Sequence, residues 1–122
     1  KANLQEQIII TDYVDNTLML SFLALANLVV IPSIHEGFGN VAIEGLMQGR
    51  TILASNTGGL PEIINHGTNG YLFNRLNADD LRVKFINLHT EKKTLDSKLL
   101  KADFQQRFTL EAQMHNLIKI IS

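Results

Sequence analysis

The sequence predicts an α/β fold in which a parallel β-sheet is flanked by helices. Short aliphatic runs alternate with stretches of helical periodicity, an order typical of parallel strands joined by helical crossovers. Such crossovers are right-handed, and they bring the carboxyl ends of the strands to one edge of the sheet, where ligands bind. With 122 residues, the chain is long enough to bury a core as one domain or as part of one.

The expected strands are runs of aliphatic, aromatic or β-branched residues bounded by polar residues or glycine. They cover residues 8–11, 28–33, 51–54 and 71–73. The first of these, Ile-Ile-Ile-Thr, is entirely β-branched and is therefore expected to form a buried strand.

Capping residues mark the expected helices. Asp15 and Asn16 can cap the first helix, and Leu18, Phe22 and Leu25 recur at helical spacing along its predicted inward face. The expected helices cover residues 17–27, 40–48 and 77–89, with a short helix from Pro61 and a helical tail over 94–122. The tail is predicted to add two apolar stripes to the core: Leu99, Phe104 and Phe108, then Met114, Leu117, Ile118 and Ile121.

Composition and charge exclude several classes of protein. The chain has 11 basic and 12 acidic residues, a formal net charge of −1, and so lacks the basic excess of a nucleic-acid-binding domain. Its apolar runs are shorter than a membrane span of about 20 residues, and it has no cysteine for disulfides or thiolate chemistry. We therefore expect a cytoplasmic protein. Because the first residue is Lys1 rather than Met, we also expect the chain to begin within a longer protein.

The most informative segment is the glycine-rich turn within residues 36–44, between the second expected strand and the next helix. Gly37 and Gly39 allow a ligand to approach the backbone closely. The start of the helix offers unpaired N–H groups and partial positive charge, which suit a phosphate. A diphosphate is expected to lie over the amides of Gly39, Asn40 and Val41.

Two carboxylates beside this turn suit a ligand rich in hydroxyl groups. Glu44, one turn into the helix, can accept two hydrogen bonds from the vicinal hydroxyls of a ribose. Glu36 is expected to bind a hydroxyl of a sugar beyond the phosphates, or to stabilise positive charge at its anomeric carbon. Together these features describe a nucleotide sugar, although their spacing alone equally fits two ordinary surface carboxylates. The nearest basic side chain, Arg50, lies at the far end of the helix, so the cation usual at such a site is missing from the loop.

These residues resemble a known family, the GT-B retaining glycosyltransferases of family 4, also called glycosyl transferases group 1. The run from Pro32 to Gly39, followed by Glu44, is similar to the E-x7-E motif of that family. Three further segments resemble its later signatures: residues 58–64 (GGLPEII), 69–72 (NGYL) and 107–109 (RFT). The motifs occur in order, and the likeness extends over nearly the whole chain.

The resemblance implies a role for each site residue. Glu36 matches the glutamate beside the donor sugar and is the expected catalytic residue. The expected donor-binding residues are Gly37, Phe38, Gly39, Asn40, Val41 and Glu44. Tyr13 and Val14 match the loop that lies against the nucleobase. The family needs no metal ion, so neither a metal site nor another cofactor is expected.

The resemblance also implies an architecture and a reaction. Residues 1–122 would form the later part of a Rossmann-like, C-terminal donor-binding domain, with C-terminal helices, and the N-terminal acceptor domain and an Arg/Lys pair for the diphosphate would lie upstream. The family transfers a sugar with retention from a nucleotide-diphosphate sugar, here to an acceptor such as a glycan or a lipid-linked group in polysaccharide biosynthesis. The expected partners are the nucleotide sugar and the missing N-terminal domain, and any peripheral membrane contact is expected through the absent regions. This chain alone is expected to bind donor weakly and not to turn it over.

Other interpretations stay open at this point. A nucleotide-sugar epimerase or a phosphorylase of GT-B architecture would use the same kind of site. The pattern Gly37-x-Gly39-x-x-Ala42 also fits a loose dinucleotide fingerprint of an oxidoreductase, although Ile34, His35 and Glu36 separate its glycines from the expected strand. A third alternative is a non-enzymatic binding module. The presence of both glutamates favours sugar transfer.

Overall fold

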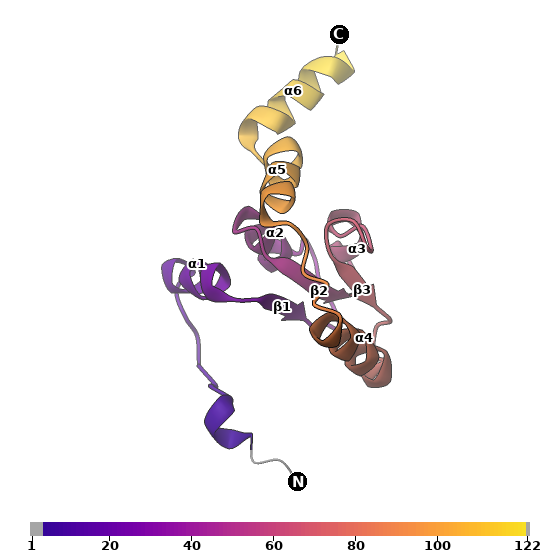
Figure 1. Ribbon diagram of the computed structural model, residues 1–122. Helices are drawn as coiled ribbons and strands as arrows, with labels where there is room; N and C mark the ends of the chain where they lie inside the picture. Colours follow the sequence, from indigo (N-terminus) through magenta and orange to yellow (C-terminus); the bar gives the residue numbers. More distant parts are fainter. Residues whose placement is uncertain (1–3, 122) are drawn as a thin grey trace.

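The computed structural model describes residues 4–121 and confirms the α/β class (Figure 1). Its parallel strands, in sheet order, are β1 (Leu28–Ile31), β2 (Thr51–Ser55) and β3 (Tyr71–Phe73). The helices are α1 (Asn16–Leu25), α2 (Asn40–Met47), α3 (Leu60–Ile63), α4 (Ala78–Thr90), α5 (Ser97–Arg107) and α6 (Leu110–Ile121), preceded by the 3-10 helix η1 (Gln5–Gln7).

The register of the sheet aligns the carboxyl ends of the three strands. Ile31 pairs with Ala54, and Ser55 pairs with Phe73, so each strand ends within a residue or two of its neighbour. The loops that leave these ends therefore emerge side by side at one edge of the sheet. The strand before the glycine-rich turn, β1, is also an edge strand of the sheet formed by the described residues.

The central strand β2 is buried along its whole length and contributes to the core on both faces of the sheet. Ile52 and Ala54 belong to a larger cluster with residues of α1, α2, α3 and α5, whereas Leu53 packs with Phe73 and with Leu88 of α4. This alternation follows from the two-residue period of a strand. Helices thus cover both faces, as a parallel sheet requires.

Two of the predicted helix starts are built as expected. The Asp15 carboxylate accepts a hydrogen bond from the Leu18 amide at 2.8 Å at the start of α1. The Asn77 side chain accepts one from the Asp80 amide at 2.9 Å at the start of α4. Each cap satisfies an amide that has no partner within its own helix.

The expected strand over residues 8–11 is wrong. This segment forms no strand, and Ile9 is 88% and Ile10 is 90% exposed. Within residues 4–121, β1 pairs only with β2, so the β-branched run has no neighbouring strand to complete it. A run of β-branched residues indicates that a segment suits a half-buried position in a sheet. A strand forms only where neighbouring elements provide such a position.

The predicted inward faces of three helices, α1, α5 and α6, are also wrong in whole or in part. In α1 it is Leu23, supported by Met19 and Leu20, that reaches the core, whereas Leu18, Phe22 and Leu25 are exposed. In α5, Leu100 is buried and Leu99 is exposed, contrary to the prediction, although Phe104 and Phe108 pack against the core as expected. In α6 the stripe predicted as core is exposed at Met114, Leu117 and Ile118. Ile121 has no described side chain. Figure 1 shows why α6 reaches no core: it extends beyond α5, away from the sheet.

Candidate functional site

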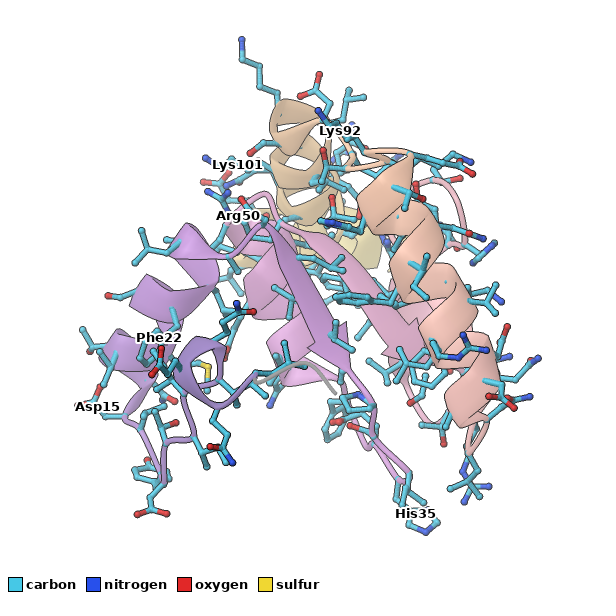
Figure 2. All side chains as sticks on the ribbon, turned by 60° about the horizontal axis from the view of Figure 1, so that its bottom comes forward. Asp15, Phe22, His35, Arg50, Lys92 and Lys101 are labelled. Atoms are coloured by element: carbon cyan, nitrogen blue, oxygen red, sulfur yellow. The ribbon has the colours of Figure 1, made fainter. Side chains whose placement is uncertain are left out.

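The glycine-rich turn leaves the carboxyl end of β1 and leads directly into α2. Gly39 is the N-cap residue of α2 and has φ +75, a left-handed conformation that favours glycine. A Cβ at Gly39 would also come within 2.8 Å of the Ile63 side chain in α3. Glycine is therefore required here both for the backbone conformation and for the close packing of α3. Figure 2 shows His35 projecting from the tip of the same loop.

The Glu36 carboxylate is held by its own loop. The Ser33 hydroxyl donates to Oε2 of Glu36 at 3.0 Å, and the Gly39 amide donates to Oε1 at 3.2 Å. This arrangement fixes the side chain at the start of α2. It also corrects one sequence expectation, because the Gly39 amide already has an acceptor and is not free for a phosphate.

The next two amides of α2 remain open. No acceptor within residues 4–121 receives a hydrogen bond from the backbone N–H of Asn40 or Val41, and both residues are exposed. The helix itself accounts for the later amides, since Ala42 and Ile43 both donate to the Gly39 carbonyl. The start of α2 thus presents two unpaired donors and the positive end of the helix dipole toward solvent.

A second glycine-containing loop, which follows β2, packs against this turn. Its Gly59 amide donates to the carbonyls of Glu36 at 3.2 Å and Gly37 at 3.1 Å. A Cβ at Gly58, which has φ +55, would lie 1.6 Å from the Glu36 carbonyl oxygen. The Gly58–Gly59 pair therefore lets the loop after β2 run directly against the loop after β1.

Sequence reasoning missed a basic residue at this edge. Arg75 follows β3, and its Nε donates to the Ile34 carbonyl at 2.8 Å, beside the Thr57 hydroxyl that donates to the same oxygen at 3.1 Å. The available signal was its position just after a strand, since parallel strands bring such residues together. By contrast, Arg50 contacts the Ala26 carbonyl at the opposite end of the sheet, as expected, and Figure 2 shows it far from His35.

A pocket of about 350 Å³ opens on one side of the turn. Its walls include Gly37, Phe38, Gly59, Ile63 and Phe108, so it lies between the turn, α3 and the junction of α5 with α6. Phe38 is itself 83% exposed. The turn is therefore accessible to a ligand rather than covered by neighbouring elements.

Glu44 lies one turn farther along α2. It follows Asn40 by four positions, so both residues lie on the same side of the helix. Glu44 is half-buried, and its carboxylate has no hydrogen-bond partner among the described residues. Tyr13 is exposed and Val14 half-buried in the segment before α1, and no hydrogen bond described in the structure joins either to the turn.

Neither a metal-binding cluster nor a membrane-spanning helix is present within residues 4–121. No group of three or more His, Asp or Glu side chains there is arranged to hold a metal ion. No helix in the same part of the chain is long and apolar enough to cross a membrane. The absence of a metal requirement and the cytoplasmic location stay predictions.

Comparison with known proteins identifies the family. The family model for glycosyl transferases group 1 matches residues 1–119. An uncharacterized glycosyltransferase of Methanocaldococcus jannaschii is 34% identical over 103 residues, which are 82% of this chain and 29% of that protein.

Solved structures give the same result for the fold. Sucrose-phosphate synthase from Thermosynechococcus elongatus superposes with a TM-score of 0.80 at 28% identity, over 98% of this chain and 31% of that one. Anabaena HepE, solved in complex with UDP, superposes with a TM-score of 0.68 at 25% identity, over 82% of this chain and 28% of that one. The chain thus spans less than a third of the length of each of these proteins. It belongs to the glycosyl transferases group 1 family, and its fold is that of the C-terminal domain of a GT-B glycosyltransferase.

Proposed function

We propose that this chain is the donor-binding part of a glycosyltransferase and that it binds a nucleotide-diphosphate sugar at the start of α2. The observation that carries the proposal is the pair of unpaired amides at Asn40 and Val41, at the carboxyl edge of a parallel sheet. A diphosphate supplies the negative charge and the acceptors that this helix start lacks. Anabaena HepE, a structural relative of this chain, was solved with UDP, which supports a nucleotide as the ligand.

The two glutamates then act on opposite sides of the diphosphate. Glu44, one turn into α2 and without a partner in the described structure, accepts from the ribose hydroxyls. Each Glu36 oxygen already receives one hydrogen bond, and a carboxylate oxygen has a second lone pair to offer. Glu36 can therefore accept from a hydroxyl of the donor sugar while its own loop holds it in position. In our proposal Glu36 is the catalytic residue and stabilises charge at the anomeric carbon.

The finer features of the reaction belong to the same proposal. We infer transfer of a hexose-like sugar with retention, without a metal ion, to a glycan or lipid-linked acceptor. Tyr13 and Val14 are proposed to lie against the nucleobase, and Gly37, Phe38 and Gly39 to line the path of the sugar. Membership in a glycosyltransferase family favours transfer over the oxidoreductase alternative, whereas a GT-B epimerase or phosphorylase would share this donor site and differ in its product.

The charge balance of the site implies weak binding by this chain alone. A helix start contributes about 0.3–1 kcal/mol per anion at an exposed site, which is little for a diphosphate. We therefore propose that residues 1–122 bind donor weakly and do not transfer sugar, and that further cationic groups complete the site in a longer protein.

Isothermal titration of the chain with UDP, ADP and GDP tests this proposal. We expect one of them to bind with a dissociation constant of roughly 1 mM, equivalent to about 4 kcal/mol. Glu44→Gln should weaken that binding at least about fivefold, because it removes a charge-assisted acceptor. The matched control is Glu111→Gln, an exposed glutamate in α6, which should leave binding unchanged.

Different results would contradict different parts of the proposal. The absence of binding by all three nucleotides, or binding that Glu44→Gln leaves unchanged, would contradict the donor site. Micromolar affinity, or measurable sugar transfer by this chain, would contradict only its incompleteness.

A further inference from the structure

We propose that Arg107 is a positioning residue for the donor-binding turn, although it lies at the end of α5. It holds the end of the short helix α3, and α3 in turn supports Gly37 and Gly39. This inference rests on the proposed function, and it adds a residue that touches neither the donor nor the reacting atoms.

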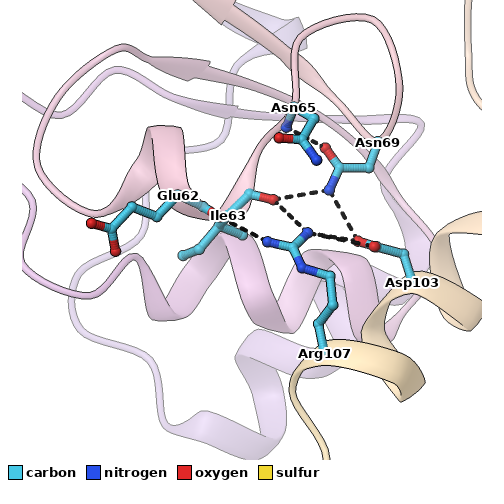
Figure 3. Close-up of polar contacts among 6 residues, drawn as sticks. All are labelled: Glu62, Ile63, Asn65, Asn69, Asp103 and Arg107. Atoms are coloured by element: carbon cyan, nitrogen blue, oxygen red, sulfur yellow. Dashed lines mark hydrogen bonds and ion pairs between the residues drawn. The ribbon is translucent and has the colours of Figure 1, made fainter. Parts of the chain in front are cut away.

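The Arg107 guanidinium connects two elements through several hydrogen bonds (Figure 3). Its Nη2 donates to the Glu62 carbonyl at 2.7 Å, and its Nη1 donates to the Ile63 carbonyl at 3.0 Å. Nη1 also pairs with Oδ2 of Asp103 at 3.1 Å, one turn earlier in α5. The guanidinium carbon lies 4.7 Å from the centre of the Phe108 ring, a distance at which a cation attracts an aromatic face.

The two carbonyls that Arg107 binds are among those that α3 cannot satisfy by itself. Helix α3 contains only Leu60–Ile63, and the last carbonyls of a helix have no partner within it. A helix of one turn is also unstable alone, because its few internal hydrogen bonds do not offset the entropy of ordering it. A positive charge at its carboxyl end favours the helix through the dipole as well.

Asn69 completes this junction from the loop after α3. Its Nδ2 donates to the Ile63 carbonyl and to Oδ2 of Asp103, both at 2.9 Å, and its Oδ1 accepts from the Asn65 amide at 2.7 Å. Asn69 is buried, and all three of these contacts appear in Figure 3. The junction is therefore a connected polar network in which the Asp103 carboxylate orients both Arg107 and Asn69.

The other side of α3 contacts the donor-binding turn. The Gly59 amide, just before α3, holds the carbonyls of Glu36 and Gly37. The side chains of Leu60 and Ile63 approach Gly39 so closely that a Cβ there would meet them at 3.2 and 2.8 Å. A shift of α3 would therefore move the turn that presents the Asn40 and Val41 amides.

The Arg107→Lys variant tests this connection, because lysine keeps the charge but lacks the planar fork that binds two carbonyls and a carboxylate together. Two quantities are measured: the dissociation constant for UDP and the hydrogen-exchange rate of the Gly59 amide. We expect UDP affinity to fall at least about fivefold and Gly59 exchange to accelerate at least about tenfold, since exchange reports local opening.

The matched control is Leu88→Val, a substitution in the cluster on the other face of the sheet. It should lower the thermal stability of the chain without changing UDP affinity or Gly59 exchange by more than about twofold. An Arg107→Lys variant whose UDP affinity and Gly59 exchange match those of the wild type would overturn the proposal. So would an equal loss of affinity in Leu88→Val, which would reduce the effect to general destabilisation. A wild-type chain that does not bind UDP at all would instead overturn the proposed function, and with it any role of Arg107 in donor binding. Unchanged Gly59 exchange in Arg107→Lys would contradict only the connection between Arg107 and the turn.

Discussion

Residues 8–11 and strand β2 are similar runs of aliphatic and β-branched residues, but the first is exposed and the second is buried. By composition the first, Ile-Ile-Ile-Thr, is the better strand, yet Ile9 is 88% exposed, whereas Ile52 of β2 is completely buried. The difference lies in the neighbours: β2 has a strand on each side and helices on both faces, and no strand described in the structure pairs with residues 8–11. The environment, rather than the residue type, therefore decides how much a side chain contributes to the stability of the fold. Substitutions at matched pairs of residues in different environments can test this.

The largest effect is expected from the isoleucines in these two runs. Ile52→Ala should lower the free energy of unfolding by about 2–5 kcal/mol, because it leaves a cavity between β2 and α2. Ile9→Ala should change it by no more than about 0.5 kcal/mol, as expected of an exposed position. Urea unfolding followed by circular dichroism measures both values, and equal losses would show that residues 8–11 are packed in solution.

The second pair sharpens the same comparison at two glycines. Gly58→Ala should destabilise the fold by about 1–3 kcal/mol, because it imposes a left-handed conformation on alanine and drives its Cβ into the Glu36 carbonyl. It should also reduce UDP binding. Gly37→Ala is the control for stability alone, since nothing lies within 4 Å of a Cβ there. Thermal unfolding compares both variants, and UDP titration compares Gly58→Ala with wild type. A Gly58→Ala protein that matches wild type in stability and in UDP affinity would contradict the contact between the two loops.

The smallest effect is expected from two neighbouring aspartates at the start of α4. The Asn74 amide, at 2.7 Å, and then Lys84, at 2.6 Å, hold the pKa of Asp80 below its ordinary value of 3.8. A lowered folded-state pKa stabilises the fold above the unfolded-state pKa, and this contribution is lost as the pH falls through the folded-state value. Asp80→Asn should therefore reduce stability at pH 7 by at most about 1 kcal/mol. The difference from wild type should shrink as the pH falls below 3.8 and disappear only below the lower pKa of the folded state.

Asp79 provides the control for this prediction. Its side chain is 93% exposed, and its carboxylate lies 3.9 Å from Arg82, a separation and exposure at which an ion pair contributes little. Asp79→Asn removes a charge from the same first turn of α4 without the partners of Asp80, so its effect on stability at pH 7 should be smaller than that of Asp80→Asn. A difference between Asp80→Asn and wild type that stays constant from pH 7 to pH 3 would show that the charge of Asp80 is not its source.

Sequence reasoning succeeded where local signals agree with the packing. The caps at Asp15 and Asn77, the buried strand β2 and the turn into α2 are each marked within a few residues of sequence. It failed where one local pattern permits two outcomes. Helix α1 is apolar on two faces, and periodicity does not tell which of Leu18 and Leu23 meets the sheet.

The candidate site shows the same limit. Its glycines and glutamates were visible because they are close together in sequence. The contacts of Arg75 and Arg107 were not predictable, because their partners Ile34 and Ile63 lie in other elements and only the fold brings them together. The hydrogen bond from the Gly39 amide to the Glu36 carboxylate is likewise a property of the folded loop.

The most direct test of the central claim is an amide-resolved NMR titration of the chain with UDP. We predict that the backbone amides of Asn40 and Val41 shift progressively and saturably, because they are the open donors at the start of α2. The Gly59 amide, which is already bonded to the turn, should shift less. Shifts that cluster away from α2, with Asn40 and Val41 unaffected at saturating UDP, would contradict the claim that this helix start binds the donor diphosphate.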